Sequence, residues 1–307
     1  MEQTIHAVAS AEGKHATPVF QKLLVAIDFS KSSEAALAYA ENLAKLYRSE
    51  ILLAHVVSLA SASSPDLGVV YTAPEIGQAM REDLEQMAQQ LRQRGTVSRA
   101  ILAEGPVADA LEQIVQKEKP NLLLAGTHGA HGLERLLLGS VAEAILRKVS
   151  CPVLTVGPGC ADATCTHRAP RTILYATVVQ HPSESARAYA ASLARAVQAN
   201  VELVYAIEEI PEMQGKEMEL EIQAQTDMLM EALRGSNCKI NIRRVYGEPV
   251  DAIIRQAVRV HADLIVLGVE RGRKLASFLP AGVAYRLISA APCPVVTLKR
   301  DGISHRG

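Results

Sequence analysis

The sequence lacks a strong excess of charge of either sign. Its 307 residues carry 32 lysines and arginines against 33 aspartates and glutamates, a formal net charge of -1. A nucleic-acid-binding domain typically carries a clear basic excess on one face. The charge balance therefore disfavours DNA or RNA as a partner.

Long apolar runs and a secretory leader are also missing. No stretch reaches the roughly 18 consecutive apolar residues that a membrane-spanning helix needs. Residues 1–20 are polar and show no basic start followed by an apolar segment, so they predict a flexible N-terminal tail instead of a signal peptide. From these absences we expect a cytoplasmic protein with no membrane partner.

Cysteines are few, and their spacing does not favour a metal site. Cys151 and Cys293 each precede Pro-Val at the start of an apolar run and are predicted to be buried structural thiols. Cys160 and Cys165 lie near His167, but a zinc site needs at least one more ligand and a tighter spacing. We therefore predict no metal.

What the sequence does contain is an internal repeat. Three stretches recur in the same order: Lys22–Asp28 as Arg171–Thr177, Leu122–Gly126 as Leu264–Gly268, and Cys151–Val156 as Cys293–Leu298. A duplicated unit of this length predicts two domains. We place them at residues 21–157 and 171–300, joined by a Gly- and Pro-rich linker at residues 158–170.

The pattern within each half predicts five strands alternating with four helices. The strands are continuous apolar runs, which indicates that helices cover both faces of a parallel sheet. Leu23–Ile27 is the first strand, and Ser30 is placed to cap a helix over Glu34–Tyr47. The predicted fold class is α/β, two tandem five-stranded parallel-sheet sandwiches of Rossmann-like type. Such sheets bind ligands beyond the carboxyl ends of their strands.

A glycine-rich stretch follows a buried strand of the first half and ends where a helix begins, over Gly126–Ser140. Glycines let a backbone approach a ligand, and a helix N-terminus favours an anion. His128 and Ser140 add side-chain donors. This arrangement favours a phosphate cradle, although a tight strand-to-helix turn explains it as well. The P-loop sequence Gly-Lys-Ser/Thr is absent.

The spacing Gly, two residues, Gly, nine residues, Gly-Ser resembles the ATP-binding motif of the universal stress protein family, and both halves resemble that family over nearly their whole length. The resemblance implies a fold of the adenine nucleotide alpha hydrolase type that binds ATP, with or without Mg²⁺. It implies an adenine flanked by Asp28 and Val56, a ribose approached by Gly126, and phosphates held by His128, Gly129, Gly139, Ser140 and Val141. Asp28 has a second interpretation, as a turn cap with Ser30.

The second half departs from this motif. Aligned positions carry Glu270, Arg271, Ala281 and Gly282 in place of His128, Gly129, Gly139 and Ser140, and Thr177 in place of Asp28. A carboxylate would repel phosphate, so we expect the second half to bind ATP poorly or not at all. Its loop gains Arg271, Arg273 and Lys274, either as a solvated basic loop or as a site for a different anion.

These features predict a nucleotide-responsive stress or regulatory protein. A slow ATPase or phosphoryl transferase is the first alternative, but no P-loop lysine, acidic pair or evident base supports an enzyme. A nucleotide-independent interaction module is the second. We expect the halves to pack as an intramolecular pseudo-dimer through Cys151–Val156 and Cys293–Leu298, and the chain to be a monomer or a homodimer.

Overall fold

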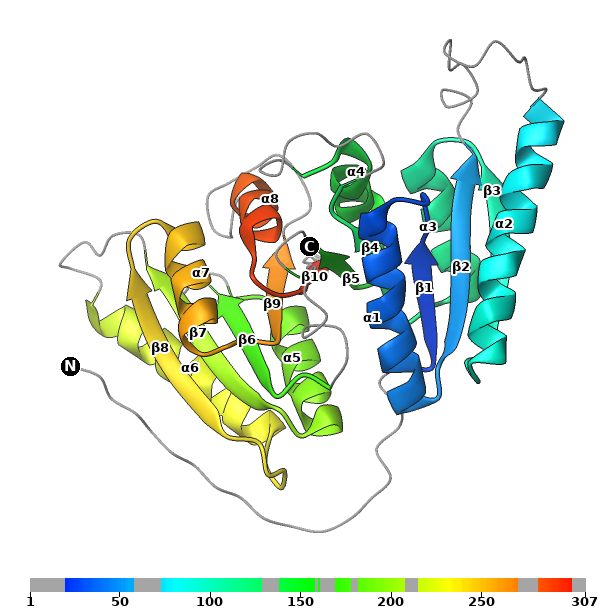
Figure 1. Ribbon diagram of the computed structural model, residues 1–307. Coiled ribbons are helices and arrows are strands. Elements are labelled where there is room, and N and C mark those ends of the chain that lie inside the picture. The colour runs from blue at the N-terminus through cyan, green and yellow to red at the C-terminus, as the bar shows by residue number, and fades with distance from the viewer. Residues whose placement is uncertain are drawn as a thin grey trace, which may run out of the picture. The chain divides into compact units, whose positions relative to one another are not determined.

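The computed structural model describes residues 20–57, 73–128, 138–157, 160, 169–177, 182–207, 215–269 and 281–299 (Figure 1). It divides into two compact units, with the boundary between His167 and Arg168. We call residues 20–167 the first unit and residues 168–307 the second unit. Within the described ranges, no helix has the length and apolar character needed to cross a membrane.

The first unit is a five-stranded parallel sheet in the order β3-β2-β1-β4-β5, with helices between successive strands. Right-handed crossovers place α1 and α2 on one face and α3 and α4 on the other. Its elements are β1 (Lys22–Ala26), α1 (Lys31–Tyr47), β2 (Glu50–Val57), α2 (Ala73–Gln93), β3 (Ser98–Glu104), α3 (Val107–Glu118), β4 (Leu122–Gly126), α4 (Ser140–Lys148) and β5 (Val153–Val156).

The second unit repeats this topology, with the strand order β8-β7-β6-β9-β10 and parallel pairing throughout. Its elements are β6 (Thr172–Thr177), α5 (Glu184–Val197), β7 (Asn200–Ile207), α6 (Gly215–Ala232), β8 (Ile240–Tyr246), α7 (Pro249–Arg259), β9 (Leu264–Val269), α8 (Ala281–Ala290) and β10 (Val295–Lys299). The predicted α/β fold class is confirmed.

The central strands owe their continuous apolar sequence to burial on both faces. Leu23, Leu24 and Val25 of β1 are fully buried, as are three successive leucines of β4. Each leucine buried this way stabilises the fold by about 1.5–3 kcal/mol through the removal of apolar surface from water. The buried central strands therefore fix the position of the residues that follow their carboxyl ends.

Helix α1 begins at the predicted cap but earlier than predicted. Ser30 is the N-cap, and its Oγ accepts a hydrogen bond from the N–H of Ser33 at 3.2 Å. The helix therefore starts at Lys31 and not at Glu34. The first turn consists of polar residues, so the spacing of apolar residues does not reveal it.

The cysteines differ in burial. Cys293 is buried, as predicted, with 2% of its surface exposed. Cys151 is only half-buried, so its assignment as a buried thiol was wrong. It lies between α4 and β5, where the chain turns at the surface.

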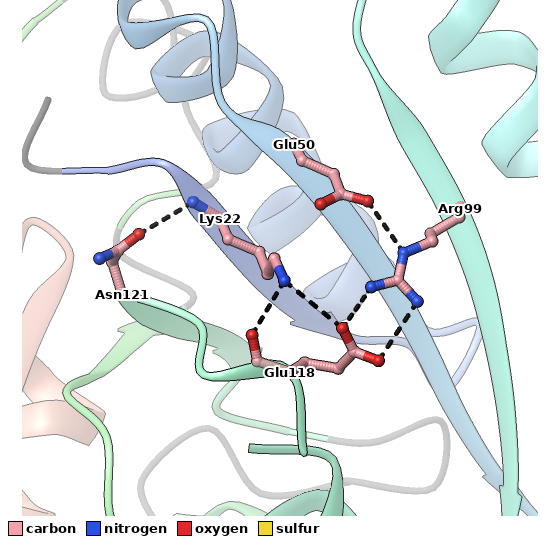
Figure 2. Close-up of polar contacts among 5 residues, drawn as sticks. All are labelled: Lys22, Glu50, Arg99, Glu118 and Asn121. Carbon is pink, nitrogen blue, oxygen red and sulfur yellow. Dashed lines mark hydrogen bonds and ion pairs between the residues drawn. The ribbon is translucent and has the colours of Figure 1, made fainter. Parts of the chain in front are cut away.

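A polar network joins the amino-terminal ends of β1, β2 and β3 to the end of α3 (Figure 2). Arg99 donates from Nε to Glu50 at 2.9 Å and forms a two-point ion pair with the carboxylate of Glu118. Lys22 donates from Nζ to the Glu118 carbonyl oxygen at 2.9 Å, and its N–H donates to Asn121 Oδ1 at 2.9 Å. The network lies at the edge opposite the carboxyl ends of the strands.

Candidate functional site

The strand order of the first unit reverses between β1 and β4. Chain order runs from β1 through β2 to β3 on one side, and β4 then pairs with β1 on the other. In open α/β sheets a ligand crevice forms outside the carboxyl ends of the strands at such a point. Figure 1 shows β1 and β4 as neighbouring strands. Asp28 follows β1 and His128 follows β4 in the chain, so two predicted site residues lie at this switch point.

Asp28 combines a capping role with an open carboxylate oxygen. Its Oδ1 accepts hydrogen bonds from Ser30 N at 3.0 Å and from Ser30 Oγ at 2.5 Å. Its side chain is exposed, and Oδ2 has no hydrogen bond from any described residue. The two interpretations of Asp28 are therefore compatible, because one oxygen holds the turn and the other is left with no hydrogen bond from a described residue.

The turn after β1 contains a residue in a left-handed conformation. Phe29 has φ 60°, which is uncommon outside glycine and asparagine and costs local strain. Its ring lies 4.9 Å from the ring of His55, and His55 Nδ1 lies 2.7 Å from the carbonyl oxygen of Ile27. Sequence reasoning missed Phe29, because its conformation leaves no mark on composition or periodicity.

Val56 lies on β2, the strand that neighbours β1 on the side away from β4. Only 9% of its surface is exposed, so its side chain belongs mainly to the core. It is one residue beyond His55, and successive strand residues face opposite sides of the sheet. Val56 therefore has only a small apolar surface available to a ligand that binds beyond the carboxyl ends of the strands.

Gly126 allows α1 to approach β4 closely. A Cβ at Gly126 would lie 2.4 Å from Ser32 Oγ and 2.7 Å from the Ser32 carbonyl carbon. In the second unit, a Cβ at Gly268 would lie 2.2 Å from Ser183 Cβ. This packing requirement explains why the glycine is present in both halves although the rest of the motif is not.

The end of β4 holds His128 through its neighbour Thr127. The Thr127 side chain is fully buried, and its Oγ1 lies 2.8 Å from His128 Nδ1. The other ring nitrogen, Nε2, is buried and has no hydrogen-bond partner among the described residues. A buried nitrogen without a partner is costly, which marks this position as one that a ligand atom can complete.

Helix α4 begins without a side-chain cap. Its N-cap is Gly139, with φ -62° and ψ 145°, and no side chain accepts from the first turn. Ser140 and Val141 are exposed, the latter with 48% of its surface accessible. Gly139 N donates to the Thr127 carbonyl oxygen at 2.9 Å, which fixes the helix start beside the end of β4. The open N–H groups and the helix dipole favour an anion here.

The remaining predicted residues of this site lie outside the described part of the chain. They are Gly129 in the first half and Glu270, Arg271, Arg273 and Lys274 in the second. In the second unit Ala281 begins α8 and Gly282 follows it, exposed. The position that corresponds to Thr127 is Val269, at the end of β9.

The assignment of Thr177 to the position of Asp28 was wrong. Lys22 pairs with Glu50 in the first unit, and Thr172 pairs with Asn200 in the second, so the two units correspond at an offset of 150 residues in these strands. Thr177 therefore matches the residue before Asp28. The true counterpart is residue 178, which is not described.

Three or more His, Cys, Asp or Glu side chains do not come together as a metal-binding group anywhere in the described ranges. Cys160 is buried, and its suggested companions Cys165 and His167 are not described. The chemistry of the site is therefore that of one carboxylate oxygen, one imidazole and one helix N-terminus at neighbouring strand ends.

Comparison with known proteins adds sequence-level evidence. The model of the universal stress protein family matches residues 20–157 and again residues 170–299. A universal stress protein of Methanocaldococcus jannaschii is 31% identical over 147 residues, covering 45% of this chain and 82% of its own length. One of Bacillus subtilis is also 31% identical over 147 residues, covering 45% of this chain and 99% of its own length.

A solved structure matches nearly the whole chain. The crystal structure of a universal stress protein from Archaeoglobus fulgidus covers 92% of this chain and 99% of its own, with a TM-score of 0.69 and 20% identity. At that identity the likeness supports the fold alone. The two sequence relatives each match 45% of this chain, which is about the length of one of its two repeats.

Proposed function

The chain belongs to the universal stress protein family, with two domains of that family in tandem, and on this premise we propose that its first unit binds an adenine nucleotide, ATP, beyond the carboxyl ends of β1 and β4. The nucleotide acts as a regulatory ligand in a stress-response protein. It influences the protein only through a difference in affinity between two conformations or assembly states.

The observation that carries this proposal is the convergence of three groups from three elements. Asp28 offers an unbonded oxygen after β1, His128 offers a buried unpartnered nitrogen after β4, and Gly139 opens an uncapped helix. A carboxylate acceptor suits the exocyclic amino group of adenine, and a helix N-terminus suits phosphate. The distribution of acceptor and donors therefore matches the two ends of a nucleotide.

The second unit supports the proposal by contrast. At its corresponding helix start it has Ala281 and Gly282, and at the strand end it has Val269 in place of Thr127. These positions carry no side-chain hydroxyl. We propose that the second unit binds nucleotide poorly or not at all.

A pair of matched charge substitutions tests the site. Ser140→Asp adds a carboxylate at the start of α4, where it repels phosphate yet suits the helix dipole, so the fold is kept. Gly282→Asp adds the same charge at the corresponding position of α8. ATP titrations followed by calorimetry are expected to show binding lost in Ser140→Asp and unchanged in Gly282→Asp. Equal behaviour of the two variants contradicts the proposed location.

We propose binding without turnover, because the described residues bring together no group of three or more His, Cys, Asp or Glu side chains that could hold a metal ion at the phosphates. Mg²⁺ would reach the site with the phosphates instead of through a resident set of protein ligands. Phosphate release from ATP above the blank, abolished by Gly139→Val, would contradict this part of the proposal and indicate a slow ATPase.

The assembly and location of the chain stay proposals. We propose an intramolecular pseudo-dimer of the two halves and a chain that is either a monomer or a homodimer, which sedimentation equilibrium of the full chain distinguishes. We propose a cytoplasmic protein, which fractionation of the expressing cells tests. If the chain is instead an interaction module that works without nucleotide, the Asp28→Ala variant should bind the same partner proteins as the wild type.

A further inference from the structure

Thr127 connects three elements at the site. It follows β4 directly, and its side chain is fully buried. Its Oγ1 lies 2.8 Å from His128 Nδ1 and 3.4 Å from the carbonyl oxygen of Val156 at the end of β5. Its own carbonyl oxygen accepts the N–H of Gly139, the cap of α4, at 2.9 Å. One residue thus contacts the imidazole, the neighbouring strand and the helix start.

The hydroxyl of Thr127 has one proton to donate, either to the carbonyl oxygen of Val156 or, when His128 Nδ1 carries no proton, to that nitrogen. The carbonyl oxygen of Val156 is the longer contact, and it already accepts the N–H of Thr127 at 3.2 Å. The imidazole nitrogen Nδ1 is the shorter contact. A neutral imidazole has one donor and one acceptor nitrogen, and the hydrogen bond made by one determines the role of the other. A hydroxyl that donates to Nδ1 leaves the ring proton on Nε2.

We propose that Thr127 is a positioning residue of the nucleotide site. Its hydroxyl holds His128 as the tautomer with a proton on Nε2, the buried nitrogen without a described partner, and its carbonyl group holds the uncapped start of α4 at Gly139. An N–H donor and a helix N-terminus are thereby fixed for the same anionic group. This inference rests on the proposed function and identifies that group as a phosphate of the nucleotide.

The second unit supplies an internal control for folding. Val269 occupies the corresponding position at the end of β9, and 8% of its surface is exposed. Valine has the shape of threonine without the hydroxyl, so this place in the fold accepts it. Thr127→Val therefore removes the hydroxyl and its hydrogen bond with little change of side-chain shape. Thr96, a buried threonine just before the amino-terminal end of β3 and therefore away from the carboxyl ends of the strands, provides a control through Thr96→Val.

The test combines binding with a spectroscopic readout. Calorimetric titration with ATP is expected to show about tenfold weaker binding for Thr127→Val, the loss of one aligned hydrogen bond. Thr127→Ser retains the hydroxyl and is expected to stay near the wild-type affinity, as is Thr96→Val. In a His128→Ala background, Thr127→Val is expected to weaken binding no further, because the threonine acts through the histidine.

The tautomer is measured in the nucleotide-free chain by ¹⁵N spectra of labelled histidines at about pH 8. The signal of His128, assigned by its absence in His128→Ala, is expected to show protonated Nε2 in the wild type and a mixture in Thr127→Val. A wild-type proton on Nδ1, or equal losses of affinity in Thr127→Val and Thr96→Val, overturns the inference. If the wild type binds no nucleotide, the proposed function fails. The tautomer of His128, measured in the nucleotide-free chain, then tests by itself whether Thr127 orients the imidazole.

Discussion

Gly126 and Ser32 lie so close together that a Cβ on the glycine would come within 2.7 Å of the serine backbone. This contact sets the distance between the first turn of α1, which Ser30 caps, and the end of β4, which His128 follows by two residues. The same relationship recurs between Gly268 and Ser183. The glycine that opens the motif is thus explained by strand–helix packing before any ligand is considered.

Gly126→Ala is expected to destabilise the chain. The added methyl group forces α1 away from β4, and overpacking of this kind costs roughly 1–3 kcal/mol. Urea unfolding should show the loss, together with weaker nucleotide binding. Gly77→Ala, at an open position on α2, is the control and should not destabilise. If Gly126→Ala has the same free energy of unfolding as the wild type, α1 can move away from β4 without loss of stability, which contradicts the expectation.

The Glu118 network predicts a pH dependence of stability. Hydrogen bonds from Arg99 hold the pKa of the Glu118 carboxyl below its ordinary value of 4.5. A group whose pKa is lowered by folding contributes stability that is fully present above the unfolded pKa and is lost as pH falls through the folded one. The free energy of unfolding should therefore fall as the pH drops below about 5.

Glu118→Gln should remove part of that dependence and cost about 1–3 kcal/mol near neutral pH, because Arg99 and Lys22 lose a charged partner. Glu143→Gln is the control, since its exposed helical pair with Arg147 is worth at most about 0.5 kcal/mol. Denaturant curves at several pH values compare the two. Equal slopes against pH for Glu118→Gln and the wild type would contradict the assigned role.

Asp28→Asn separates the two functions of the carboxylate. The amide oxygen still accepts from Ser30, so the turn and the stability of the chain should change little. The other oxygen becomes an NH₂ donor, which opposes the amino group of adenine. We expect about tenfold weaker ATP binding and a loss of preference for ATP over GTP. Retained preference in this variant would remove Asp28 from adenine recognition.

Much of the fold was predictable because burial leaves a direct mark on sequence. The continuous apolar runs indicated strands covered on both faces, and Ser30 was identified as a cap from its hydroxyl and position. The recurrence of Leu122–Gly126 as Leu264–Gly268 located the same strand in both units. These features depend on residues close together in the sequence or on a regular pattern of burial, and both can be read from one sequence.

The site was less predictable because its geometry depends on contacts between distant segments. No sequence pattern singles out Thr127, although its hydroxyl contacts the end of β5 and its carbonyl oxygen contacts the start of α4. The left-handed Phe29 had no sequence signal. The displaced alignment of Thr177 arose because a strand of apolar residues matches its counterpart almost equally well when shifted by one position.

The central claim is one nucleotide site per chain, in the first unit. Mass spectrometry of the purified full-length chain under native conditions, followed by identification of the nucleotide released on denaturation, measures it directly. The account predicts one adenine nucleotide per chain for the wild type and none for Ser140→Asp. Two nucleotides per chain would contradict the proposed loss of the second site, and a wild type that neither carries nor takes up ATP would contradict the proposed function itself.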